Sequence, residues 1–303
     1  MAMTLYTHAD SNIQKTWLYI SGFLVFIIVL GWIISYFTNS YAILIIAVIY
    51  SVLTSFFSYW YSDKIVLAIN RAKLIEKKDN PELYRLVENL CITAGLPLPK
   101  IYIIQESQPN AFATGRDPKH AAIAVTKGLL DRLERVELEG VIAHELSHIG
   151  NRDILIQSMI VVLVGVVVIL TDLFFRMAFW GGIGRRSDRN GGQARVIMLL
   201  FALALAVLAP LFAQLVKLAI SRKREFLADA EGALLTRYPE GLASALEKIS
   251  KDPTPLGIAN NSTAHLYIAS PFKGKQNRSW LTKLFMTHPP AEERIRALRG
   301  IKV

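Results

Sequence analysis

Residues 144–148 read His-Glu-Leu-Ser-His, a pentapeptide that can hold a metal ion and activate water. His144 and His148 are four positions apart, so on an α-helix they lie one turn apart on the same face, where two imidazoles can bind one Zn²⁺. Glu145 flanks that face and can take a proton from a metal-bound water. Apolar residues recur with helical spacing and predict this helix; they are Leu138, Val141, Ile142, Leu146 and Ile149.

The composition of the 303-residue chain favours a membrane protein with a sizeable soluble part, because 52% of its residues are hydrophobic. The net charge is +10, and the positive excess lies in residues 154–303. No aromatic-basic recognition motif accompanies this charge, so we expect contact with anionic lipid head groups and not with nucleic acid. The single cysteine, Cys91, excludes an intramolecular disulfide and a cysteine-based zinc knuckle.

Four apolar stretches are long enough to cross about 30 Å of hydrocarbon. They are residues 17–37, 41–61, 154–180 and 196–220. We do not expect the first to be a cleaved signal peptide, because its apolar region is too long and a second span follows at once. Aromatic residues end the stretches, as in interfacial belts; they are Trp17, Tyr36, Tyr41, Trp60 and Trp180.

These spans divide the chain into membrane and soluble segments that alternate. We expect an N-terminal transmembrane hairpin at 1–61 and a first part of the catalytic domain at 62–153. A second transmembrane hairpin at 154–220 and a second part of the catalytic domain at 221–303 then follow. Four crossings place both termini and both catalytic parts on the same side of the membrane.

Basic residues beside the spans favour the cytoplasmic side for the catalytic parts, by the positive-inside rule. They are Lys64, Arg71, Lys73, Lys77, Lys78, Arg152, Lys217, Arg222, Lys223 and Arg224. The loop 180–195 is a counter-signal, because it carries four arginines against one aspartate. The alternative is that the third and fourth spans do not cross fully and that this loop stays inside.

A catalytic zinc needs a third protein ligand besides two histidines. The fourth apolar stretch passes without Gly or Pro into residues 221–229, so we expect its helix to continue out of the membrane. There Glu225 and Asp229 are four apart and share a face. Glu225 can bind the metal, and Asp229 can accept the far N–H of a ligand histidine and set its tautomer. The nearest competitor, Glu231, has no acidic partner four residues on.

An HExxH helix followed by a separate ExxxD helix resembles the gluzincin metallopeptidases. Four motifs narrow the resemblance: Asn-Ala-Phe-Ala-Thr-Gly at 110–115, Ala-His-Glu-Leu-Ser-His at 143–148, Arg-Glu-Phe-Leu-Ala-Asp at 224–229 and Thr-His-Pro-Pro at 287–290. In this order, with spans before and between them, they are similar to the HtpX-type membrane proteases and their relatives, the CAAX prenyl endoproteases. The resemblance implies a zinc endopeptidase of a bacterial inner membrane, with a cytoplasm-facing site and a role in membrane-protein quality control.

The segment 110–115 is the expected place for substrate. Residues 100–105 and 121–126 are short β-branched runs that predict strands on either side of it. An edge strand near the metal can bind a peptide by strand addition, and either 121–126 or 110–115 can be that edge. The resemblance implies that Asn110 and Ala111 hold the substrate backbone. The alternative for Asn110 is a turn residue before a strand.

His288 precedes two prolines that restrict its backbone, and Pro290 is expected to start a helix. The resemblance implies that His288 contacts the substrate or the transition state and does not bind zinc; the alternative is a structural loop histidine. Asp79 or Asn80 is expected to cap a helix that runs to about residue 94. Residues 252–280 are rich in Pro, Gly, Asn, Ser and Lys and predict a long loop, a candidate flap over the site.

Together these patterns and the resemblance predict a mainly α fold with a small β-sheet, an α+β zincin-like catalytic domain, plus four transmembrane helices. We expect one Zn²⁺ per chain, bound by His144, His148 and Glu225. Glu145 acts as the base and His288 assists at the oxyanion, while Asp229 orients one ligand histidine, His144 by analogy with the gluzincins.

The expected partners are protein or peptide substrates and the lipid bilayer. His148 lies only six residues before Ile154, about 9 Å along a helix, which favours cuts in juxtamembrane or loosened membrane-protein segments. Two alternatives remain. One is a CAAX-type processing endoprotease, which the four spans disfavour, and the other is a membrane scaffold that uses zinc only to fold.

Overall fold

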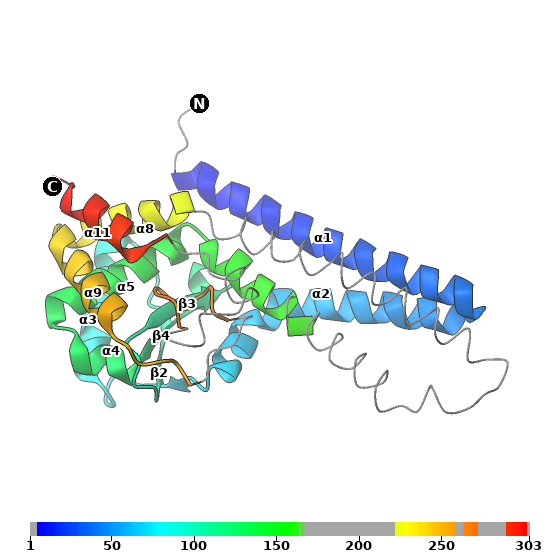
Figure 1. Cartoon of the computed structure of the whole chain (residues 1–303), viewed down its shortest axis with the longest axis horizontal. Helices are drawn as coiled ribbons and strands as arrows, with labels where there is room; N and C mark the ends of the chain where they lie inside the picture. Colours follow the sequence, from blue (N-terminus) through cyan, green and yellow to red (C-terminus); the bar gives the residue numbers. More distant parts are fainter. Residues whose placement is uncertain (1–4, 164, 167–221, 258–262, 272–288, 302–303) are drawn as a thin grey trace.

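The computed structural model describes residues 5–163, 165–166, 222–257, 263–271 and 289–301 (Figure 1). Two long helices, α1 (Leu5–Thr38) and α2 (Tyr41–Ile69), form an antiparallel hairpin that projects from a body of shorter helices and one small sheet. The start of α1 lies beside the body, and the turn between the two helices lies at the far end of the hairpin. The prediction of a mainly α fold with a small sheet is confirmed.

Small side chains allow close packing in the hairpin. A serine stripe along α2 is buried; it comprises Ser51, Ser55, Ser58 and Ser62. A Cβ on Gly31 of α1 would lie 2.2 Å from the Cβ of Ala47, so α2 passes there at a distance that only glycine permits. Large apolar side chains cover the outer faces; they include Val25, Val29, Trp32, Ile45, Ile46, Ile49, Leu53 and Phe56. A helix surrounded by lipid presents this kind of surface, and a soluble one rarely does.

Within the described residues, two helices are long and apolar enough to cross a membrane, Asp10–Ile33 in α1 and Tyr41–Ile69. The predicted spans 17–37 and 41–61 fall on them. The predicted span 154–180 is described only as far as residue 166, and its apolar helix Asp153–Leu163 is largely buried. The span 196–220 and the loop 180–195 lie outside the described residues. A count of four spans, with the division into segments that follows from it, therefore stays a prediction.

A four-stranded mixed sheet lies next to the inner end of α2. Its strands are β1 (Lys73–Leu74), β2 (Lys100–Ile104), β3 (Ala111–Gly115) and β4 (Ala121–Thr126), in the order β1-β2-β4-β3. β2 and β4 run parallel, whereas β1 and β3 pair antiparallel to their neighbours. The two predicted strands are thus the central ones, and of the two candidate edges it is β3 that lies at the edge of the sheet.

The helices of the body are α3 (Pro81–Ala94), α4 (Lys127–Arg132), α5 (Arg135–Gly150), α8 (Arg222–Thr236), α9 (Pro239–Lys251) and α11 (Ala291–Arg299), with a 3-10 turn at Pro118–His120. Asn80 caps α3, because its side chain accepts the Leu83 N–H at 3.0 Å. Gly95 ends that helix in the left-handed region, with φ +66°. Pro290 stands directly before α11, as expected.

Helix α5 is the centre of the body. It contacts α3, α8, α9 and the edge strand β3, so nearly every side of it is covered. Its apolar side chains are accordingly not confined to one stripe, and Val141, Ile142, Leu146 and Ile149 are all buried. Burying each such side chain is worth about 1.5–3 kcal/mol relative to exposure, so the helix that carries the histidines is firmly held.

Candidate metal centre and active site

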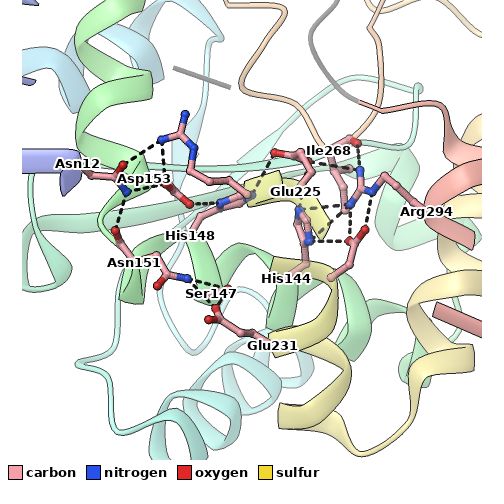
Figure 2. A network of polar contacts seen from close by, with 12 residues as sticks. Asn12, His144, Ser147, His148, Asn151, Asp153, Glu225, Glu231, Ile268 and Arg294 are labelled. Carbon is pink, nitrogen blue, oxygen red and sulfur yellow. Dashed lines mark hydrogen bonds and ion pairs between the residues drawn. The ribbon is translucent and has the colours of Figure 1, made fainter. Parts of the chain in front are cut away.

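Helix α5 carries His144, Glu145 and His148, and all three side chains are buried. Helix α8 crosses α5 and brings Glu225 and Asp229 to them. Figure 2 shows Glu225 beside the two histidines. The crossing is close because α8 has a glycine at this point: a Cβ on Gly232 would lie 3.0 Å from the backbone N of His144. Two helices that are distant in the sequence therefore share one buried polar site.

The three candidate ligands offer a donor set that suits zinc. Glu225 Oε2 lies 3.9 Å from His144 Nε2, and Glu225 Oε1 lies 3.6 Å from His148 Nε2. One donor atom from each residue lies within 4.8 Å of the others, and the described part of the chain holds no second group of this kind. Ligands of a tetrahedral Zn²⁺ with bonds near 2.0–2.1 Å are about 3.3 Å apart, so small adjustments of these side chains suffice to enclose an ion.

His144 is oriented by Asp229. The imidazole Nδ1 lies 3.0 Å from Asp229 Oδ1, which leaves Nε2 on the side of Glu225. Burial lowers the pKa of His144 to about 4, and the nearby Arg294 guanidinium adds to this, although the Asp229 carboxylate opposes it. His144 is therefore neutral at physiological pH and has a lone pair for a metal.

His148 is oriented by a residue that the sequence patterns did not single out, Asp153. His148 Nδ1 lies 2.9 Å from Asp153 Oδ2. Asp153 follows the turn that ends α5, where Arg152 adopts a left-handed conformation with φ +57°. The available signal was an acidic residue five positions after the second histidine, just beyond a Gly-Asn helix end.

Burial alone would lower the pKa of His148, but the Asp153 hydrogen bond and the Glu225 and Glu145 carboxylates outweigh it. Together they raise the pKa to about 9. Burial likewise opposes ionisation of Asp153, yet the His148 hydrogen bond and Arg224 hold the pKa of that carboxyl below its usual value. The environment of His148 thus strongly favours a positive charge at this position, which a bound cation also provides.

A polar cluster behind His148 reaches the first helix of the chain. Asn12, in α1, donates its side-chain amide to Asp153 Oδ1 at 2.8 Å and to the Asn151 carbonyl at 3.0 Å. Arg224 completes the cluster, because its Nη1 donates to Asn12 Oδ1 and to Asp153 Oδ1, both at 3.1 Å. We call Asn12, Asp153 and Arg224 the His148 support cluster. It joins the metal-site helix α8 to the hairpin.

A second residue absent from the sequence-based site is Arg294, in α11. Arg294 is 1% exposed, and its side chain donates two hydrogen bonds to Asp229, of 2.8 and 2.6 Å. It also donates to the Ile268 carbonyl at 3.0 Å and lies 3.5 Å from Glu225 Oε2. Burial opposes ionisation of Asp229, but Arg294 outweighs it and lowers the pKa to about 2. Arg294 follows the Pro-Pro pair by four residues, and this proximity was the only sequence signal for it.

Asn110 and Ala111 lie at the start of the edge strand but are not exposed. The Asn110 amide donates to the Ala269 carbonyl at 3.0 Å, and the Ala111 carbonyl accepts the Ile268 N–H at 3.0 Å. Segment 263–271, part of the predicted long loop, therefore covers this end of β3, and most of its side chains are buried. The carbonyl of its Ile268 is the one that Arg294 binds, which places this segment beside the metal site.

Two more residues that the sequence raised as candidates are Glu231 and His288. Glu231 faces away from the metal ligands and accepts hydrogen bonds from Ser147 and from Asn151 Nδ2, the latter at 2.6 Å. It is therefore no competitor of Glu225 in this structure. His288 lies outside the described residues, as do Thr287 and the remainder of the predicted loop beyond residue 271.

Comparisons with known proteins agree with this site. The sequence model of peptidase family M48 matches residues 77–302. The Protease HtpX homolog of Thermoanaerobacter pseudethanolicus is 44% identical over 300 residues, which cover 98% of each chain. That of Dictyoglomus thermophilum is 45% identical over 298 residues, covering 98% of this chain and 94% of the relative. That of Thermococcus sibiricus is 48% identical over 258 residues, covering 84% and 85%.

Among solved structures, S. mikatae Ste24p has a similar fold, with a TM-score of 0.50 and 20% identity. The match covers 97% of this chain and 66% of that one, and at this identity it concerns the fold alone. The family match extends over most of the chain, and the relatives align along nearly its whole length. This chain therefore belongs to peptidase family M48 and is a membrane metalloprotease.

Proposed function

We propose that this protein is a zinc endopeptidase that cleaves membrane or misfolded proteins in protein quality control. The observation that carries the proposal is that His144, His148 and Glu225 meet in a buried site where carboxylates outnumber guanidiniums. Four buried carboxylates surround the site, and two guanidiniums balance only half of their charge; the six residues are Glu145, Asp153, Glu225, Asp229, Arg224 and Arg294. With both histidines neutral, as metal ligands are, one divalent cation would balance the remaining two negative charges, and buried charge that is left unbalanced is costly.

His144, His148 and Glu225 would hold the zinc, and Asp229 and Asp153 hold the two imidazoles in the tautomer that presents Nε2. A zinc ion bound there would lower the pKa of a water molecule and polarise the scissile carbonyl. Glu145, buried beside both histidines on α5, then removes the proton of the attacking water. The same carboxyl delivers that proton to the leaving amine nitrogen, which completes hydrolysis.

We also propose contacts between the protein and the substrate peptide. His288 would donate a hydrogen bond to the developing oxyanion. The substrate would add as a strand along β3, the edge strand next to α5. Asn110 and Ala111 can hold its backbone only when segment 263–271 moves aside, because that segment now occupies their hydrogen-bonding groups.

The position of the site supports substrates that lie at the membrane. Trp17 of α1 stacks on Tyr59 of α2 with ring centroids 5.6 Å apart, and paired aromatic residues of this kind mark the bilayer interface. Asn12 precedes Trp17 by five residues, about 8 Å along the helix, and it belongs to the support cluster of His148. With the interface at Trp17 and Tyr59, the proposed metal site would lie close to the bilayer surface. We propose that the catalytic parts face the cytoplasm and that all four predicted spans cross the membrane.

The test is Glu145→Gln in the full-length protein, stripped of metal and then titrated with zinc, with casein as the substrate. Glu139→Gln is the matched control, since Glu139 lies on the same helix and pairs with Arg135 at the surface. We expect the Glu145 variant to bind zinc like the parent and to lose hydrolysis by about 10²–10⁴-fold. Hydrolysis at the parental rate would refute the mechanism. No observation favours a CAAX-type processing enzyme or a non-catalytic scaffold.

A further inference from the structure

The length and the aromatic residues of the hairpin indicate where the bilayer ends. Starting from Tyr41 at the outer turn, about 20 residues of α2 span the ~30 Å of hydrocarbon, which brings the interface to Trp60. The stacked pair Trp17 and Tyr59 lies at the same level on the two helices. α2 continues to Ile69, so its last two turns stand outside the hydrocarbon, at the depth of the lipid head groups.

A hollow of about 660 Å³ opens at this depth, between the inner end of α2 and the sheet. One wall comes from α2 and includes Trp60, Tyr61 and Lys64. The other wall comes from the body and includes Lys100 at the start of β2, with Arg116 and Lys119 from the turn between β3 and β4. Aromatic and basic side chains therefore face each other across a space that is large enough for a head group.

The hollow has an excess of positive charge. Its lining carries four permanent cations, Lys64, Lys100, Arg116 and Lys119, against one carboxylate, Asp63. A second carboxylate nearby, Asp117, is engaged by His120 at 2.8 Å and by Arg116 at 3.5 Å. Among the described residues, the ion pairs engage Arg116 but none of the three lysines. The lysines are exposed and remain available to an anion.

Two of the four cations lie against aromatic rings of α2. The Arg116 guanidinium lies 4.7 Å from the centre of the Trp60 ring, and the Lys64 ammonium lies 5.0 Å from that of Tyr61. Such contacts hold a cation beside an apolar face without neutralising it. A ligand here needs a negatively charged head group and an apolar part that continues along Phe56, toward the membrane.

We propose that this hollow binds the head group of an anionic phospholipid from the surrounding leaflet. The phosphate lies among Lys64, Lys100 and Lys119, and the acyl chains extend past Trp60 and Phe56 along α2. Lipid binding attaches the sheet to the bilayer surface and keeps the body at a constant distance from it. The proposal needs only the membrane insertion of the hairpin, so it stands apart from hydrolysis.

The experiment uses the full-length protein with Glu145→Gln, so that proteolysis plays no part. The protein is placed in nanodiscs of equal phosphatidylglycerol and phosphatidylcholine, and the retained lipids are identified by native mass spectrometry. We expect preferential retention of phosphatidylglycerol. Each cation near an anionic lipid surface is worth about five-fold in binding, so Lys64→Gln with Lys100→Gln lowers retention about 30-fold. Lys100→Gln with Lys119→Gln, two exposed positions on the body, is expected to act alike.

The matched control is Lys78→Gln with Lys127→Gln, which removes the same charge from exposed positions outside the hollow. It is expected to retain the lipid, and thermal unfolding checks that all variants are folded. Equal retention of the two lipids by the parent, or full retention by both hollow variants, would overturn the proposal. Displacement of phosphatidylglycerol by millimolar inorganic phosphate would show that the site serves a free anion, and it would overturn the assignment to lipid.

Discussion

Asn12 and Asp153, 141 positions apart, are joined by a buried hydrogen bond of 2.8 Å between the Asn12 amide and Oδ1 of the carboxylate. The other oxygen of Asp153 binds the far nitrogen of His148 at 2.9 Å. A residue of α1, the first candidate membrane helix, thus supports a candidate metal ligand through a single intermediate side chain. The hairpin therefore contributes to the surroundings of the candidate metal site.

The first prediction concerns this link. Asn12→Ala removes a donor from a buried carboxylate, and Asp153 loses part of its hold on His148. Partners behind a metal ligand are usually worth 10–100-fold in metal affinity, and we expect a loss of about 10-fold for Asn12→Ala and more for Asp153→Asn. Competition with a fluorescent chelator measures it. Gln14→Ala, at an exposed position on the same helix, is the control, and equal affinities of the two variants would contradict the role of Asn12.

A second prediction concerns the buried pair of Arg294 and Asp229. Arg294→Met leaves a buried carboxylate without its cation, which costs about 3–5 kcal/mol of folding free energy. Adding Asp229→Asn removes the unpaired charge, so the double variant is expected to recover part of the loss. Arg299→Met on the same helix breaks exposed pairs with Glu240 and Glu247 and should cost about 1 kcal/mol or less. Denaturant unfolding measures the free energy of unfolding of the three variants. Similar decreases for Arg294→Met and Arg299→Met would be inconsistent with a buried charge pair.

A third prediction tests the packing of the hairpin with two glycines of one helix. A Cβ at Gly31 would overlap Ala47, whereas a Cβ at Gly22 meets no atom within 4 Å. Gly31→Ala is expected to destabilise the protein by about 1–3 kcal/mol through overpacking. Gly22→Ala is expected to be neutral or slightly stabilising, because alanine favours helix. Thermal unfolding in detergent compares them. If Gly31→Ala were as stable as Gly22→Ala, the close approach of α1 and α2 would be wrong.

The fourth prediction is a pH dependence of the zinc-stripped protein. The pKa of His148 rises from 6.5 to about 9, so the folded chain binds more protons than the unfolded one in this window. That contribution to stability is complete below pH 6.5 and is lost as the pH rises toward 9. The pKa of His144 falls to about 4, so its contribution is complete above pH 6.5 and is lost as the pH falls toward 4. Stability should therefore be greatest near pH 6.5.

Zinc loading changes the alkaline side of this profile. A metal-bound His148 is neutral, so the loss of stability between pH 6.5 and 9 should disappear when zinc is present. Zinc binding near pH 7.5 should also release a proton, and calorimetry in two buffers of different ionisation enthalpy measures that release. His120→Gln, an exposed histidine, serves as the control. The same alkaline loss with and without zinc would contradict the prediction.

The local parts of this protein could be predicted from the sequence. The HExxH helix, the strands at 100–105 and 121–126, the capped helix after Asn80 and the two hairpin helices all follow from periodicity, capping and apolar length. These patterns depend on neighbours within a few positions. The pairing of Glu225 with Asp229 also could be predicted, because both residues lie on one helix face.

The tertiary structure alone decided which distant residues meet. Asn12, Asp153, Arg224 and Arg294 come from four places in the sequence, and no spacing rule connects them. Gly232 is what allows α8 to reach α5, yet a glycine within a helical pattern has no such meaning until the two helices are seen to cross. The order of the strands decided that β3 is an edge, and the fold decided that the buried segment 263–271 covers one end of it. The types of the candidate ligands can be read from the local sequence. The buried charges that orient and balance them cannot, because they lie far apart in the chain and meet only when the helices pack together.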